Sequence, residues 1–210
     1  MSDRPLTGTR VFFLGAEGPH GRRIAVALGE AGATVVLASL APSTRAEFQL
    51  NSIANEFWAF GASAETRLAD LSDANSLAGA LEGAGEVDVV VTHVLHGPGA
   101  EDPRNAVTQV DTLLWRAIQS REGLLIVQVI GGDPETAGYA GAAQELLERT
   151  RRLAEDGRAR ACAVILDGGM PAVLAPFLPQ ERFETPDAGE AVRSAVTRRL
   201  DGVALYADLP

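Results

Sequence analysis

The chain has 210 residues, of which 46% are hydrophobic and 22% charged, a composition typical of a globular protein with a sizeable core. Its formal net charge of −10 disfavours nucleic-acid partners and anionic membrane surfaces, because both need clustered basic side chains. A single cysteine, Cys162, excludes an internal disulfide, and the sequence shows neither a signal peptide nor a membrane-length apolar run. We therefore expect a cytoplasmic protein.

Short apolar runs alternate with helical patterns almost to the end of the chain. Ser43 and Ser72 are the expected N-caps of the second and third helices, and Gly32 is the expected C-terminal cap of the first. The pattern predicts strands at 10–15, 34–38, 66–69, 87–94, 124–130, 161–166 and 203–207. It predicts helices at 20–31, 43–60, 73–82, 103–120, 136–155 and 187–200.

The predicted strands are apolar throughout rather than alternating, as in a parallel sheet that is covered on both faces. Repeated strand–helix units predict an α/β fold with a doubly wound sheet of about seven parallel strands, in the order 3-2-1-4-5-6-7. No repeat, low-complexity segment or linker interrupts the pattern, so we expect residues 1–210 to form a single domain.

A glycine-rich loop joins the first predicted strand to the first predicted helix. Gly15, Gly18 and Gly21 permit a tight turn there, and the following helix N-terminus offers N–H groups and partial positive charge to a phosphate. Two residues oppose that role, because Pro19 lacks a backbone donor and Glu17 adds negative charge near the expected phosphates. The loop is either a dinucleotide site or a plain connection.

The order of several motifs resembles the short-chain dehydrogenase/reductase (SDR) family. The stretches LGAEGPHGRRIAVALGEAGATVVLAS, ADLSD, VDVVVTHV, LLIVQVIGG, YAGAAQELLERTRRLA and VILDGGMP follow one another as that family's motifs do, over nearly the whole chain. The resemblance implies a Rossmann-like fold, an NAD(P) cofactor and hydride transfer. The cofactor-binding positions that it implies are Gly15, Gly18, Gly21, Arg22, Ser39, Asp70, Leu71 and Thr92.

The resemblance leaves NAD and NADP both open. Ser39 stands at the end of the second strand, where an NAD-preferring member has an acidic residue, and Arg45 is close in sequence. Arg22 and Arg23 begin the first helix and would partly offset the charge of Glu17. Because the loop has lost a donor and gained an anion, we expect NAD(P) binding to be weak or absent.

The family's catalytic residues are mostly missing. Tyr139 falls at the position of the family's tyrosine, but Ala143 replaces the lysine one helical turn later, and the chain contains no lysine. Gly131 or Gly132 falls at the serine position, and Asp111 lies nearest the asparagine position. Each positioned acid or base typically contributes ~10²–10⁴-fold, so the family's reaction should be nearly lost. Tyr139 is then either a residual acid or a helix-start aromatic that packs on its neighbours.

All three histidines fall in loops at one edge of the predicted sheet. His20 follows the first strand, while His93 and His96 follow the fourth, at the switch point where open parallel sheets bind ligands. We expect them to bond a bound anion or loop backbone rather than a metal, because metal binding needs convergent ligands. Cys162 is expected to be a buried, inert thiol.

Two functions are compatible with these residues. The first is a degenerate SDR-like protein that acts as a structural or regulatory subunit, and the second is an NAD(P)H-dependent oxidoreductase in which Tyr139 or a histidine is the acid. The helices at 103–120 and 136–155 predict a dimer, with a second copy or a related chain. The apolar residues that motivate this prediction are Trp115, Leu146, Leu147 and Leu153. The segment FLPQERFETP is expected to cover the sheet edge or to dock on a partner.

Overall fold

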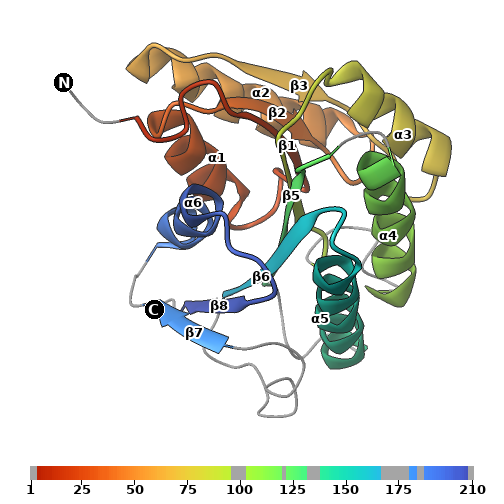
Figure 1. Cartoon of the computed structure of the whole chain (residues 1–210). Coiled ribbons are helices and arrows are strands. Elements are labelled where there is room, and N and C mark those ends of the chain that lie inside the picture. Colours follow the sequence, from red (N-terminus) through yellow and green to blue (C-terminus); the bar gives the residue numbers. More distant parts are fainter. Residues whose placement is uncertain are drawn as a thin grey trace.

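A computed structural model describes residues 4–95, 103–119, 122–131, 138–166, 180–183 and 187–207. These residues form one sheet of eight parallel strands, in the order β3-β2-β1-β4-β5-β6-β8-β7 (Figure 1). The strands are β1 (Arg10–Leu14), β2 (Thr34–Ala38), β3 (Ala64–Arg67), β4 (Val89–His93), β5 (Leu125–Ile130), β6 (Arg160–Leu166), β7 (Gln180–Phe183) and β8 (Ala204–Ala207). The helices are α1 (Gly21–Glu30), α2 (Thr44–Phe57), η1 (Trp58–Phe60), α3 (Ala74–Gly83), α4 (Pro103–Gln119), α5 (Tyr139–Asp156) and α6 (Ala188–Arg198).

The predicted α/β class, parallel sheet and strand order are confirmed, with one strand added. Strand β7 pairs with β8 at the outer edge of the sheet, from Gln180 beside Ala204 to Phe183 beside Ala207. It lies within the segment that was expected to cover the sheet edge. Within the strand, Glu181 forms an ion pair with Arg198 of α6, at 2.6 Å between Oε1 and Nη1.

The structure tests two predicted helix N-caps and the predicted start of one strand. Ser43 caps α2 as expected, since its side chain accepts a bond from Ala46 N–H. The prediction that Ser72 caps the third helix was wrong, because the N-cap is Asp73, whose carboxylate accepts from the backbone two residues on. Strand β3 also begins two residues earlier than predicted.

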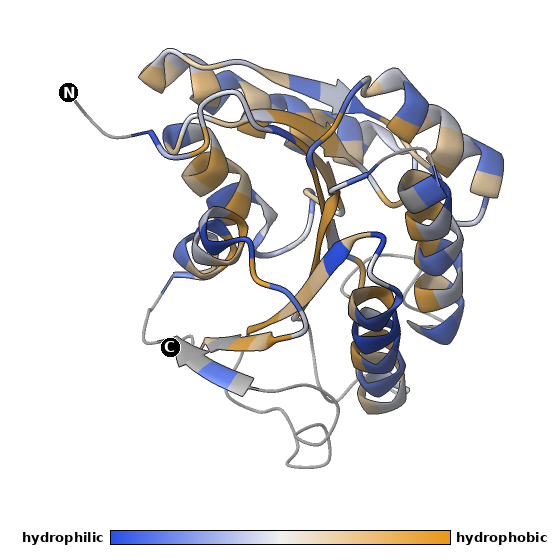
Figure 2. Cartoon of the chain, viewed as in Figure 1, coloured by the Kyte–Doolittle hydropathy of each residue, from blue (hydrophilic) through white to orange (hydrophobic). Residues whose placement is uncertain are grey.

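Helices cover both faces of the sheet and create two cores. Helices α1, α2 and α6 lie on one face and α3, α4 and α5 on the other (Figure 1). Alternate residues of one strand enter different cores, so Phe12 and Phe13 of β1 are both fully buried, on opposite faces. Figure 2 shows the central strands as the most hydrophobic part of the chain, with polar residues on the outer sides of the helices.

The apolar residues of α5 serve the protein's own core. Leu146, Leu147 and Leu153 are each at most 2% exposed, so they do not supply the free apolar surface on which the dimer prediction was based. Trp115 of α4 is exposed, as expected, and so is Trp58 at the end of α2. Among the helices of the described ranges, none is long and apolar enough to cross a membrane.

Candidate functional site

The glycine loop is tied to the carboxyl end of β2. Gly15 adopts a φ of +86°, which favours glycine, and its N–H donates to Ala38 O at 2.8 Å. The N–H of Ala16 donates to the same carbonyl at 3.3 Å. The loop therefore starts as a tight turn that crosses from β1 toward β2.

Gly21 is needed where α1 begins, whether or not a ligand binds. A Cβ at this position would lie 1.8 Å from Ala16 O, so no larger residue fits without moving the backbone. The loop also uses its own donors, because Gly18 N–H bonds to Gly15 O at 3.2 Å and Gly21 N–H bonds to Gly18 O at 2.9 Å. The turn at Gly15 and the close approach at Gly21 account for these two glycines without a nucleotide.

The start of α1 keeps some capacity for a phosphate. In the described part of the chain, the N–H groups of Arg22 and Arg23 have no backbone acceptor, as expected for a first helical turn. The side chain of Arg22 does not offset Glu17, because its Nε donates to Glu56 Oε1 on α2 at 2.7 Å. Backbone donors and the helix dipole therefore remain to meet a phosphate at this helix start.

Glu17 is turned to the end of β2. Its Oε1 accepts a bond from Leu40 N–H at 2.6 Å, and its Oε2 is buried with no hydrogen-bond partner among the described residues. Burial raises the pKa of the Glu17 carboxyl, while the Leu40 N–H and its own N–H act in the opposite direction. Sequence reasoning identified the charge of Glu17 but placed it beside the phosphates, because a backbone partner 23 residues away leaves no side-chain signal.

The predicted adenosine-side residues are engaged in internal hydrogen bonds. Ser39 is fully buried, and its Oγ donates to Ala69 O at 3.1 Å and accepts from Ala69 N–H at 2.9 Å. The N–H of Leu71 donates to Leu40 O at 2.6 Å. Asp70 Oδ1 accepts from the N–H and the hydroxyl of the serine two residues on, at 2.8 and 2.6 Å. These bonds tie the end of β2 to the turn after β3.

Polar residues gather at the switch point between β1 and β4. His93 is fully buried at the end of β4, with Nε2 3.3 Å from Gly131 O, and the centroid of its ring lies 5.9 Å from that of His20. Thr92 is also buried, and its Oγ1 has no hydrogen-bond partner among the described residues. The third histidine, His96, lies outside those residues. Within the described ranges, no group of three or more His, Cys, Asp or Glu side chains is placed to hold a metal.

The candidate acid Tyr139 begins α5 and is only 4% exposed, packed among apolar side chains on the α4–α5 face of the sheet. Ala143, one turn later, is fully buried in the same core. Asp111 on α4 forms an ion pair with Arg149 of α5, at 2.6 Å between Oδ2 and Nη1. Asp111 therefore links two helices instead of taking the role of the family's asparagine.

The serine position is also sterically restricted. A Cβ at Gly131 would lie 3.2 Å from Leu166 Cβ and 3.4 Å from His93 Nε2, so the neighbours would have to yield for a serine to fit. Gly132, the alternative serine position, lies outside the described residues.

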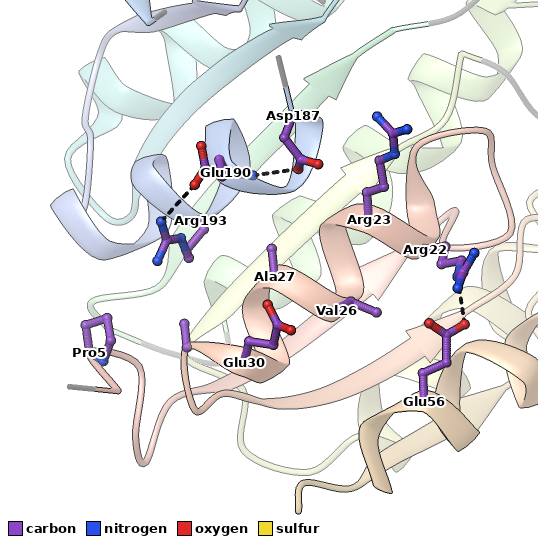
Figure 3. A pocket seen from close by; sticks show the side chains of 11 residues that line it. Pro5, Arg22, Arg23, Val26, Ala27, Glu30, Glu56, Asp187, Glu190 and Arg193 are labelled. Atoms are coloured by element: carbon purple, nitrogen blue, oxygen red, sulfur yellow. Dashed lines mark hydrogen bonds and ion pairs between the residues drawn. The ribbon is translucent and has the colours of Figure 1, made fainter. Parts of the chain in front are cut away.

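A separate cleft of about 820 Å³ lies on the outer surface, between α1 and α6 (Figure 3). Val26 and Ala27 contribute apolar surface to it, and charges of both signs surround them, including the pair of Arg193 with Glu190 at 3.5 Å. The cleft runs along helix flanks rather than at the carboxyl ends of the strands. Because of its mixed charges and its position, this cleft is not part of the nucleotide site.

Comparison with solved structures identifies the fold. The chain is similar to a hydroxysteroid dehydrogenase from Escherichia coli, with a TM-score of 0.72 and 18% identity over 99% of this chain and 98% of that one. It is similar to a Pseudomonas aeruginosa RhlG/NADP active-site complex (TM-score 0.72, 17% identity, 99% and 98% covered). A blue fluorescent protein from a metagenomic library, in complex with NADPH, gives a TM-score of 0.72 with 23% identity and 97% and 98% covered.

These likenesses extend over almost the whole chain, and the identities are low enough that they show the fold alone. The chain has the fold of the short-chain dehydrogenases/reductases, with a strand–loop–helix unit at its start. No protein-family model matches the sequence. No curated protein matches it either.

Proposed function

We propose that this chain is an SDR-like protein that keeps the dinucleotide frame, binds nucleotide weakly and does not carry out the family's hydride transfer. The observation that carries this proposal is the first turn of α5. Tyr139 is nearly buried and Ala143, fully buried, stands where the resemblance implies a lysine. A tyrosine hydroxyl has a pKa of ~10, and no ammonium group is available at that position to favour the phenolate.

The serine position supports the same conclusion. Gly131 provides no hydroxyl, and the tight surroundings of its missing Cβ disfavour a larger residue. Each lost acid–base or positioning group removes on the order of 10²–10⁴-fold. The combined loss is large enough to reduce the family's reaction to background.

Weak nucleotide binding follows from the internal bonds at the end of β2. Leu40 uses its N–H for Glu17 and its carbonyl for Leu71, so the groups that would meet an adenosine are already satisfied. A nucleotide would have to replace these bonds. The N–H groups at the start of α1 still favour a phosphate, and either NAD or NADP is compatible with this frame.

A subunit role is supported by the outer surface of α4 and α5, which we call the α4–α5 surface. Along α5, Glu145 and Glu148 form ion pairs with Arg149 and Arg152 one turn later, which gives the surface an ordered row of charges. The exposed Trp115 of α4 lies on the same side of the sheet and adds an apolar side chain that a partner could cover. We propose a homodimer, or a pair with a related SDR chain, through this surface.

The second candidate is an NAD(P)H-dependent oxidoreductase with unusual catalytic groups. It is favoured by one observation, the approach of His20 and His93 at the switch point. An imidazolium can donate a proton to a carbonyl oxygen.

The two candidates differ in a single-turnover experiment. The protein, in excess over NADH or NADPH, is mixed with a panel of ketones and aldehydes, and the nicotinamide absorbance is followed beside a buffer control. We expect no oxidation above the control, and weak binding in calorimetry. Carbonyl reduction that the variant His93→Ala abolishes would establish the second candidate and refute the first.

A further inference from the structure

The outer side of α2 differs from that of an ordinary surface helix. Helix α2 covers the β3 edge of the sheet, with α1 as its neighbour on that face (Figure 1). A surface helix packs one apolar stripe on the core and usually presents charged side chains on the opposite side. The inner stripe of α2 is apolar as expected, with the buried residues Ala46, Leu50, Ile53 and Phe57. Between residues 48 and 60, however, the only charged side chain is Glu56, and it forms an ion pair with Arg22 of α1.

Two large aromatic side chains lie at the ends of this uncharged outer side. Phe48 is 74% exposed and Trp58 is 75% exposed, more than any other large hydrophobic residue in the described part of the chain. With Asn51 and Asn55 between them, they follow a spacing of three, four and three residues, as the contact positions of a coiled coil do. The helical backbone continues through Trp58, whose φ and ψ are −64° and −28°. All four residues therefore lie on one side of the helix, and we call them the α2 stripe.

The α2 stripe is complementary to itself when two copies pack antiparallel. A two-fold axis through the middle of the stripe places Phe48 of each copy against Trp58 of the other, and Asn51 against Asn55 between them. Asn51 Oδ1 accepts a bond from the hydroxyl of Thr66 at 3.3 Å, so the amide hydrogens of Asn51 remain for the carbonyl oxygen of the other copy's Asn55. A shifted register would instead set an aromatic ring against an amide.

The charge of the chain also favours this stripe as the place where two copies meet. Each chain has a formal net charge of −10, so two copies repel each other, and they approach at the lowest electrostatic cost through an uncharged surface. The four aromatic side chains of such a pair would remove roughly 450–750 Å² from water, given their exposure. A stable interface buries roughly 1,200–2,000 Å², so the area predicts a weak dimer rather than a permanent one.

We propose that the α2 stripe is an interaction surface for a second copy of this chain, through which two molecules form an antiparallel dimer with a dissociation constant of about 10–100 μM. This surface is separate from the α4–α5 surface, because α2 and the pair of α4 and α5 cover opposite faces of the sheet (Figure 1). An α2 dimer forms whether or not the α4–α5 surface is used. It also does not depend on nucleotide binding or on the loss of hydride transfer.

The test is sedimentation velocity on the full chain, over a range of about 1–500 μM. All samples carry Trp115→Glu, which puts a charge on the α4–α5 surface, so that any dimer reports the α2 contact. We expect the mass to double as concentration rises. Adding Phe48→Glu should weaken association at least about tenfold, because it removes an aromatic ring and introduces a charge on both copies. The position is exposed, so the variant should fold, which circular dichroism checks.

Two further variants test the specificity and the orientation of the contact. Asn75→Glu is the matched control, because it adds the same charge to an exposed position of α3 on the other face of the sheet and should leave association unchanged. The double variant Asn51→Lys with Asn55→Asp places each new cation opposite a new anion of the other copy, if the helices are antiparallel. Association should then be at least as tight as in the parent, whereas parallel helices would set like charges against each other.

Each contrary outcome overturns the proposal in a different way. A monomer up to the highest concentration would leave the α2 stripe for a protein of different sequence. Association that Phe48→Glu does not weaken would place the contact elsewhere, and weaker association in the double variant would contradict antiparallel pairing. If wild type dimerises and Trp115→Glu abolishes it, the α4–α5 surface carries the contact, which supports the proposed homodimer and refutes this one. Carbonyl reduction in the single-turnover experiment would refute the proposed function and leave the α2 dimer unaffected.

Discussion

Replacing Gly21 with alanine tests whether the glycine loop is dictated by the protein's own backbone. The added Cβ would lie 1.8 Å from Ala16 O and 2.5 Å from Ala16 C, and backbone atoms cannot rotate away as a side chain can. Overpacking costs ~1–3 kcal/mol, and a backbone clash belongs at the upper end of that range. Alanine's better helix propensity returns at most ~1 kcal/mol. The net loss in the free energy of unfolding is therefore about 2 kcal/mol, a fall in Tm of ~4–8 °C for a chain of this size.

The assay is urea unfolding followed by circular dichroism, with Gly79→Ala as the matched control. Gly79 lies inside α3 and a Cβ there meets nothing within 4 Å, so the same substitution should raise stability by ~0.5–1 kcal/mol. If Gly21→Ala unfolds at the wild-type urea concentration, the close approach to Ala16 is no constraint, and the glycine would need a ligand to explain it.

Three further predictions concern buried groups. Burial raises the pKa of Glu17 above its ordinary value of 4.5, so ionisation of this carboxyl lowers the free energy of unfolding as pH rises from 4.5 to the folded pKa. Glu17→Gln should therefore have a higher free energy of unfolding than wild type at neutral pH. A gain that persists below about pH 4 would contradict this reasoning. Ala143→Lys should lower the free energy of unfolding by about 3 kcal/mol and give no turnover in the single-turnover assay. Part of that stability should return toward pH 10, because burial lowers a lysine's pKa. Thermal melts at several pH values check this, and a melt like that of wild type would contradict it. Burial raises the pKa of Cys162 to about 12, so a disulfide reagent should label it only after unfolding, and stoichiometric labelling of the native protein would refute the assignment.

The strand order was predictable because parallel strands buried on both faces appear as continuous apolar runs. Strand β7 was not, since its residues, Gln-Glu-Arg-Phe, have neither an apolar run nor clean alternation, and an edge strand needs little burial. The leucines of α5 misled the dimer argument for a related reason. Composition shows that Leu146 and Leu147 are apolar, and only the packing shows that the core uses both.

In the candidate site, too, the sequence reveals which functional groups are present but not how the side chains are oriented. The loss of lysine at Ala143 could be seen in the sequence, because a missing functional group needs no geometry. The direction of the Glu17 carboxylate could not, since its partner is a backbone N–H that every non-proline residue carries. The same holds for Ser39, whose partners are the backbone groups of Ala69.

The two tryptophans give the protein a built-in optical probe of association. Trp58 and Trp115 both lie outside the core, on elements that cover opposite faces of the sheet. Trp58, which is 75% exposed, should emit much as indole does in water, and Trp115, which is 36% exposed, should emit at a somewhat shorter wavelength. Contact through the α4–α5 surface would shield Trp115 and shift its emission to shorter wavelengths, while Trp58 would stay in solvent. In a Trp58→Phe variant, a dilution series would then report the dissociation of a dimer from a single indole.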